Sequence, residues 1–98
     1  MVTIMDEIYK DVAEIVMERM EVNYYDMLTS NEQRFVDARA MLAMALVGRG
    51  MNQKVIASMM GLTRQGVNKL INGFDDRVRY SFTLRKAWDD ISNEVATR

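Results

Sequence analysis

Apolar residues recur along the first 22 positions with the three- and four-residue spacing of one helix face. At about 100° per residue they form a single stripe, made of Met1, Ile4, Met5, Ile8, Val12, Ile15 and Val16. The opposite side carries the charges, which are Asp6, Glu7, Lys10, Asp11, Glu14, Glu18 and Glu21. The pattern predicts an amphipathic helix over residues 1–22 with an acidic outer face. Its apolar stripe suits two roles equally, covering the core of the same chain or pairing with a second copy.

The helical pattern breaks over residues 23–28, and a helix start signal follows. Thr29 and Glu32 have the spacing of a capping box, in which the hydroxyl and the carboxylate each satisfy a free backbone N–H group. A second helix is therefore expected to begin at this point.

The stretch from Phe35 to Val47 is apolar almost all round, since Asp37 and Arg39 are its only charged residues. A helix without a polar face is typically buried, so this segment is predicted to form the centre of the fold. Gly48 and Gly50 supply the left-handed backbone that ends helices, and a short loop is expected after them.

Two short helices are predicted next, each with a capping residue before its first turn. Asn52 is a good N-cap for a helix that ends at Gly61, and Thr63 for a helix that ends at residues 72–73. A tight turn therefore joins the two helices.

A last helix is expected after residues 74–80, with Ser81 or Thr83 as its N-cap. Its apolar residues recur at i, i+4, i+7 and i+11, and these are Leu84, Trp88, Ile91 and Val95. The chain is thus predicted to be all-α, with about five helices.

Composition agrees with a single helical domain over residues 1–98. The hydrophobic share of 49% and the charged share of 28% are ordinary for a globular protein, and ten Met with no Pro favour helices. The absence of Cys and His excludes zinc sites and catalysis by a thiol or an imidazole. The neighbouring acids at 75–76 and 89–90 do not share a helix face, so they predict no acid–base or metal pair. We expect no metal, no cofactor and no enzymatic activity.

The net charge of −1 is divided unevenly along the chain. Residues 1–47 hold four basic residues against nine acidic ones, whereas residues 48–98 hold nine basic against five acidic. Within residues 48–86 the balance is eight basic to two acidic. A segment with that excess of positive charge suits a polyanionic partner.

No segment has the length or composition of a membrane span or a signal peptide. The longest apolar run, Ala40 to Val47, has eight residues, whereas a span needs about 20. The first turns contain Asp6 and Glu7 and no basic start. A cytoplasmic location and no membrane partner are expected.

Residues 53–72 have the pattern of two helices that cross near a right angle. Such a crossing needs a small residue at the contact, a left-handed residue at the turn and apolar anchors on the facing sides. Ala57, Gly61, Val67 and Leu70 fill these packing roles. Three further apolar residues complete the inner side, namely Ile56, Met60 and Leu62. With apolar residues, Ala and Gly at these positions, the segment resembles the DNA-binding helix-turn-helix of the phage repressor and Cro families.

A longer span, from Phe35 to Val95, resembles less closely the Trp-repressor and replication-initiator DnaA C-terminal group. It shares the order of a buried helix, the two-helix motif and a further helix. A full initiator is excluded, because the chain contains no phosphate-binding loop.

The resemblance implies that residues 63–72 form a recognition helix in the major groove of double-stranded DNA. Base contacts are implied for Arg64, Gln65 and Asn68, since Arg matches the acceptors of guanine and side-chain amides match adenine. Phosphate contacts are implied for Gln53, Lys54, Thr63, Lys69, Asn72, Arg77 and Arg79. Arg85 and Lys86 either extend this basic surface or are solvated charges, and the same alternative applies to Arg77 and Arg79.

A homodimer is also implied, because one recognition helix covers only half of a two-fold site. Residues 1–28 are available for dimerisation, and residues 29–98 are expected to form the DNA-binding core. The leading hypothesis is a small sequence-specific transcriptional regulator of bacterial or phage type.

Two other hypotheses remain open. The same residues suit an accessory DNA-binding factor in replication or recombination. Alternatively, the motif only builds a trihelical core, and the chain is a protein–protein adaptor that uses its acidic first helix. Gly66 lies within the expected recognition helix, where Gly costs about 1 kcal/mol relative to Ala. Close approach of DNA to the backbone and evolutionary drift account for Gly66 equally well.

Overall fold

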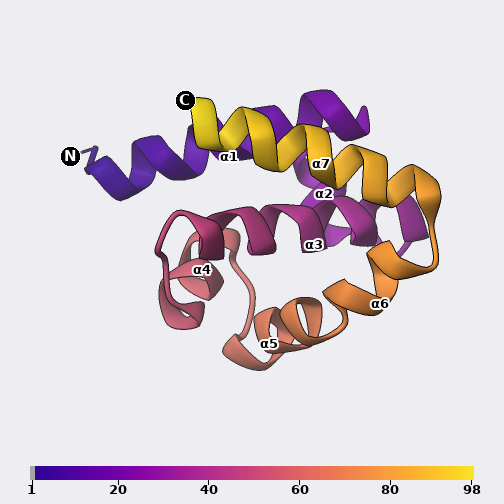
Figure 1. Ribbon diagram of the computed structural model, residues 1–98. Helices are drawn as coiled ribbons and strands as arrows, with labels where there is room; N and C mark the ends of the chain where they lie inside the picture. Colours follow the sequence, from indigo (N-terminus) through magenta and orange to yellow (C-terminus); the bar gives the residue numbers. More distant parts are fainter. Residues whose placement is uncertain (1) are drawn as a thin grey trace.

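The computed structural model describes residues 2–98, and this part of the chain is helical with no strand. Figure 1 shows the order of the seven helices, which are α1 (Ile4–Met20), α2 (Tyr24–Thr29), α3 (Gln33–Gly48), α4 (Gln53–Met60), α5 (Arg64–Asn72), α6 (Phe74–Arg79) and α7 (Phe82–Thr97). The all-α prediction is confirmed. The number of about five is too low, because two six-residue helices, α2 and α6, occupy segments that we expected to be irregular.

Helix α3 is the centre of the fold, as its apolar sequence predicted. It runs between α1 and α7 on one side and α4 and α5 on the other (Figure 1), and it contacts all six other helices. Ala38, Met41, Leu42 and Leu46 on α3 have no exposed surface. The helix includes Gly48 as its last residue, so the left-handed backbone that we expected at both glycines occurs only at Gly50, with φ of 90°.

Helices α1 and α7 cover α3 from the same side. From α1 the core receives Val12, Ile15 and Val16, and from α7 it receives Ile91 and Val95. These five residues belong to the two predicted apolar stripes. The apolar stripe of α1 therefore covers the core of its own chain over the second half of the helix.

The beginning of the predicted α1 stripe lies outside the core. Val2, Ile4 and Met5 are 71%, 76% and 46% exposed, and Met1 lies outside the described residues. The helix starts at a capping box in which the Asp6 N–H donates to the Thr3 hydroxyl and the Thr3 N–H donates to the Asp6 carboxylate. The Thr3 hydroxyl also donates to this carboxylate at 3.0 Å, and the hydrogen bonds from the Thr3 N–H and hydroxyl lower the pKa of Asp6.

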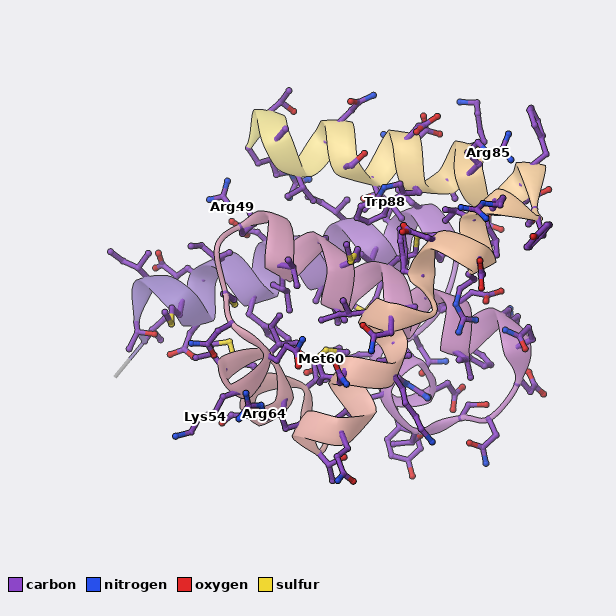
Figure 2. The ribbon with its side chains drawn as sticks, turned by 60° about the horizontal axis from the view of Figure 1, so that its bottom comes forward. Arg49, Lys54, Met60, Arg64, Arg85 and Trp88 are labelled. Atoms are coloured by element: carbon purple, nitrogen blue, oxygen red, sulfur yellow. The ribbon has the colours of Figure 1, made fainter. Side chains whose placement is uncertain are left out.

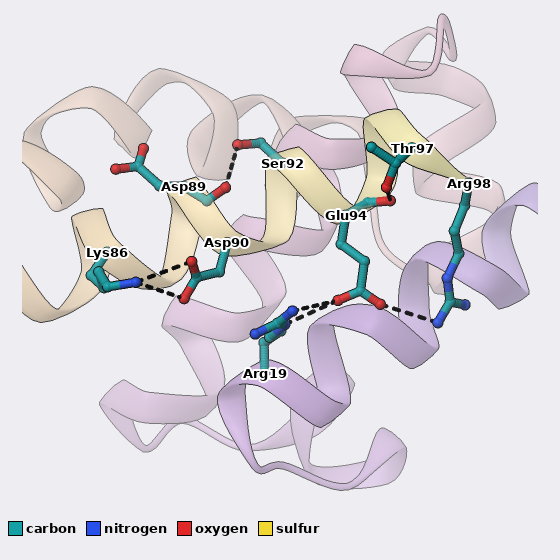
Figure 3. A network of polar contacts seen from close by, with 8 residues as sticks. All are labelled: Arg19, Lys86, Asp89, Asp90, Ser92, Glu94, Thr97 and Arg98. Carbon is teal, nitrogen blue, oxygen red and sulfur yellow. Dashed lines mark hydrogen bonds and ion pairs between the residues drawn. The ribbon is translucent and has the colours of Figure 1, made fainter.

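Ion pairs link α1 to α7 across their outer edge (Figure 3). Arg19 of α1 lies 2.9 Å from the Glu94 carboxylate of α7, and Arg98 lies 3.1 Å from its other oxygen. Within α7, Lys86 pairs with Asp90 at 3.2 Å. On this side of the molecule Arg19, Lys86 and Arg98 therefore have acidic partners, while the acidic residues of α1 form no ion pair within residues 2–98.

Residues 23–28, which we expected to break the helical pattern, form most of α2. The side chain of Asn23 caps the helix by accepting the N–H of Asp26 at 2.8 Å. Met27 is fully buried against the rest of the core. So short a helix has little stability of its own, and the burial of Met27 is a contact that periodicity alone does not reveal.

The capping box predicted at Thr29 and Glu32 is wrong. Thr29 is the last residue of α2, and its hydroxyl donates to the Tyr25 carbonyl oxygen at 2.8 Å. Helix α3 begins after Glu32 without a side-chain cap. Its Arg39 instead donates to the carbonyl oxygens of Met27 and Ser30, at 2.8 and 2.6 Å. These bonds satisfy carbonyl groups at the end of α2 that have no partner within the helix.

The end of the chain forms α6 and α7. Ser81, and not Thr83, caps α7 by accepting the N–H of Leu84 at 3.2 Å. Trp88 packs edge-on against Phe74 of α6, with 4.7 Å between the ring centroids. In the described residues, no helix combines the length and the apolar character that a membrane crossing requires.

Candidate nucleic-acid interface

Helices α4 and α5 are joined by a turn of three residues, Gly61 to Thr63. Hydrogen bonds between residues close in sequence fix the helix ends. Gly61 ends α4 with φ of 69°, and the following Leu62 N–H donates to the Ala57 carbonyl at 2.9 Å. Thr63 caps α5 by accepting the Gly66 N–H at 2.9 Å. Asn52 caps α4 through the Val55 N–H at 2.9 Å. All three predicted helix-end signals, Asn52, Gly61 and Thr63, are thus confirmed.

The inner sides of α4 and α5 face each other and α3. Ile56 and Val67 have no exposed surface, and Ala57, Met60 and Leu70 are at most 8% exposed. Both helices contact α3. The packing fixes the rotation of α5 about its axis, and so determines which of its residues face outward.

Five polar residues on α5 share its outward side, and all are exposed: Arg64, Gln65, Asn68, Lys69 and Asn72. At 3.6 residues per turn they span about 140° of the helix circumference. This face combines two positive charges with three side-chain amides, each of which has donors as well as an acceptor. It is continuous, because no apolar side chain of α5 interrupts it.

Gly66 has a local explanation that its sequence context did not show. A Cβ atom at this position would lie 3.2 Å from the Thr63 hydroxyl oxygen, which caps the same helix. Because Gly has no Cβ atom, the hydrogen bond from the Gly66 N–H to the Thr63 hydroxyl is not disturbed. This contact accounts for Gly66 without DNA approach or drift, and spacing along the sequence does not reveal it.

Residues from the start of α4 lie beside those of α5. Gln53 lines a shallow hollow of about 310 Å³ together with Arg64, Gln65 and Asn68. A neighbouring open groove of about 570 Å³ is lined by Gln53, Arg64 and Lys54, among others. Figure 2 shows Lys54 and Arg64 close together at one end of the molecule. The three residues expected to read bases and two of those expected to contact phosphate therefore form one surface.

This surface carries positive charge that the protein does not neutralise. No Asp or Glu occurs between Asp37 and Asp75. Among the basic residues of that interval, Lys54, Arg64 and Lys69 form no ion pair with any residue of the described chain, 2–98. The region is therefore open to an anionic partner.

Two of the predicted phosphate contacts, Arg77 and Arg79, do not join this surface. Arg77 is paired with the Asp37 carboxylate at 2.6 Å, and both side chains are mostly buried. Lys69 lines a different hollow, with Arg77 and the α3 residue Arg39. Arg79 on α6 is exposed and lies 4.0 Å from Asp76.

Arg85 and Lys86 belong to the far end of the molecule. Figure 2 shows Arg85 well away from Lys54 and Arg64. Arg85 donates to the Arg79 carbonyl at 2.7 Å, and Lys86 is paired with Asp90. Both therefore have protein partners of their own.

Two features of this region were missed at the sequence level. Arg39 lines the hollow that also contains Lys69, although its sequence context indicated only a buried helix. A lone arginine in an apolar helix is the signal that points to it. The sequence around Asp37 likewise does not indicate its ion-pair partner, Arg77, which is 40 residues away.

Comparisons with protein-family models, curated proteins and solved structures find no significant match for this chain.

Proposed function

We propose that this protein binds double-stranded DNA in a sequence-specific manner through α5. In this proposal α3, α4 and α5 form a trihelical helix-turn-helix core, and α5 enters the major groove. The observation that carries the proposal is the continuous polar face of α5, which adjoins Gln53 and Lys54. Its basic residues, Arg64 and Lys69, form no ion pair within residues 2–98.

The residues suit distinct parts of such a contact. Arg64, Gln65 and Asn68 have the donors and acceptors that discriminate bases in the major groove. Gln53 and Lys54 lie in the first turn of α4, where free N–H groups favour a phosphate. Lys69 and Asn72 extend the polar face toward the end of α5. A small transcriptional regulator is the role that we infer from this combination.

Selection from a random duplex pool tests the proposal. We expect a consensus sequence, with Arg64→Ala and Asn68→Ala each weakening binding to it by about 1–3 kcal/mol and relaxing the base preference at a few positions. Asn93→Ala is the matched control, since Asn93 is exposed on α7 away from this surface. A pool that yields no consensus, or the same loss from the control, would refute sequence-specific binding.

We further propose that the protein binds as a homodimer. A two-fold dimer places two recognition helices about 34 Å apart on one side of the duplex. The exposed apolar start of α1, with Val2, Ile4 and Met5, is the surface that we assign to the contact. Sedimentation velocity should show a dimer that Ile4→Glu converts to a monomer, while Tyr80→Ser, which changes another exposed apolar residue, leaves it intact. A monomer in the unaltered protein would contradict this part of the proposal.

A further inference from the structure

A second hollow lies between α3, α5 and α6, beside the polar face of α5. Its volume is about 300 Å³, and three of its lining residues are basic, namely Arg39, Lys69 and Arg77. The others are small or apolar, and no acidic residue lines it. Three cations from three helices therefore converge on one cavity.

Arg39 is held rigidly at this site. Its Nε and Nη2 atoms donate to the carbonyl oxygens of Met27 and Ser30, so only Nη1 has no protein partner in the described chain. Burial lowers the pKa of Arg39, because water no longer solvates the cation fully. No carboxylate pairs with it within residues 2–98.

Arg77 and Lys69 also have unused hydrogen-bonding capacity. Arg77 Nη1 is bound to Asp37, but its Nε atom is buried and has no hydrogen-bond partner in the described part of the protein. A buried donor without a partner is unfavourable. Lys69 is exposed and unpaired. With Asp37 counted, the four charged groups carry a net charge of +2.

We propose that this hollow binds a phosphate group. A free phosphate or a phosphomonoester carries a charge of about −1.5 to −2 at neutral pH, which matches the net charge of the site, whereas a DNA phosphodiester or a carboxylate carries a single charge and neutralises half of it. Guanidinium groups also offer the paired donors that phosphate oxygens accept. The side chains of Val36, Leu62 and Leu70 also line the site.

The phosphate can come from either of two sources. Lys69 stands at the edge of the polar face of α5, so a backbone phosphate of bound DNA can reach it. A free phosphate or a phosphorylated small molecule fits the same chemistry. Only the first source rests on the proposed DNA binding.

Titration of the intact chain with inorganic pyrophosphate, followed by amide NMR, tests the site without DNA. We expect saturable shifts around Gly66, Lys69 and Arg77. Lys69→Met should weaken pyrophosphate binding about tenfold, the loss expected for one charged hydrogen bond. Lys10→Met, which removes an exposed lysine of α1, should leave it unchanged. Acetate at equal ionic strength should cause no saturable shift, and equal responses to both anions would overturn the assignment to phosphate.

A second measurement distinguishes the two sources. If the site holds a DNA phosphate, Lys69→Met weakens binding to every duplex and lowers the slope of log affinity against log salt by about 1. If it holds a free phosphate, DNA binding is unchanged while pyrophosphate binding weakens. The proposal is overturned if pyrophosphate causes no shift at these residues and Lys69→Met leaves the salt slope unchanged. A chain that binds no DNA but does bind pyrophosphate would refute the proposed function and leave this site supported.

Discussion

The two sides of α3 carry their charges in opposite ways. On the side of α1 and α7, Arg19 and Arg98 share the Glu94 carboxylate, and Lys86 pairs with Asp90. On the side of α4 and α5, Lys54 and Arg64 have no acidic partner in the described chain. Both sides are built on the same buried helix.

This difference separates a surface whose basic residues are paired from a surface whose basic residues are available for binding. Exposed ion pairs contribute only about 0–1 kcal/mol each, so the α4–α5 side forgoes little stability by lacking them. Unpaired like charges instead create a positive potential that attracts a polyanion. The balanced total of −1 therefore conceals an excess of acidic residues on α1 and a group of unpaired basic residues on the α4–α5 side.

The largest expected effect concerns Arg77, whose ion pair is mostly buried, unlike those of α1 and α7. Arg77→Met leaves the Asp37 carboxylate buried with Gln33 as its remaining donor, and we expect a loss of about 2–4 kcal/mol in unfolding free energy. Urea denaturation measures it. Adding Asp37→Leu should recover part of the loss, because no carboxylate then stays without its cation. A loss under 1 kcal/mol in the single variant would show that this pair contributes no more to the unfolding free energy than an exposed ion pair does.

The next effect concerns the start of α5. Thr63→Ala removes the cap and should cost about 1 kcal/mol. Gly66→Ala in the unaltered protein should gain less than the full helix-propensity difference of about 1 kcal/mol, because the new Cβ meets the Thr63 hydroxyl. In the Thr63→Ala background the same change should gain the full amount. Equal gains in both backgrounds, measured by urea denaturation, would show that the contact has no effect.

A smaller effect compares the two sides directly. Glu94→Gln removes the partner of Arg19 and Arg98, and we expect a loss below about 1 kcal/mol that shrinks as salt is added. Lys54→Met on the α4–α5 side should leave stability unchanged or slightly higher. Thermal unfolding at low and high salt measures both variants. A greater loss from Lys54→Met than from Glu94→Gln would reverse the comparison.

The smallest effect is at the exposed start of α1. Hydrogen bonds from Thr3 lower the pKa of Asp6 below 3.8, its ordinary value. The stability from this capping box is therefore complete above the ordinary pKa and is lost as the pH falls through the lowered one. Amide NMR of residues 3–8 should show fraying in acid that Asp6→Asn displays already at neutral pH. Fraying at the same pH in both proteins would contradict this role.

The features that the sequence predicted best are those that depend on residues close to one another in the chain. Asn52, Thr63 and Gly61 act on backbone groups within four residues, so their roles could be inferred from spacing. The apolar character of α3 likewise requires burial whatever surrounds it. The burial of α3 and the boundaries of α4 and α5 thus follow from signals within each segment.

The features that could not be predicted depend on distant partners. Helix α2 is held by the burial of Met27 and by two hydrogen bonds from Arg39, 12 and 9 residues away from their acceptors. From the sequence alone Arg77 has the charge expected of a phosphate contact. In the structure, however, it is paired with Asp37. The charge pattern along a sequence does not distinguish a paired arginine from an unpaired one. The structure was therefore needed to separate Arg77 from the residues of the candidate site.

Mapping a duplex onto the protein by amide NMR tests the central claim most directly, with the selected duplex or, failing one, a mixed-sequence duplex as the ligand. The account predicts shifts concentrated at the start of α4, around Gln53 and Lys54, and along α5 from Arg64 to Asn72, with the outer faces of α1 and α7 unchanged. Shifts centred on α1 or α7, or no shifts at all at low salt, would contradict it.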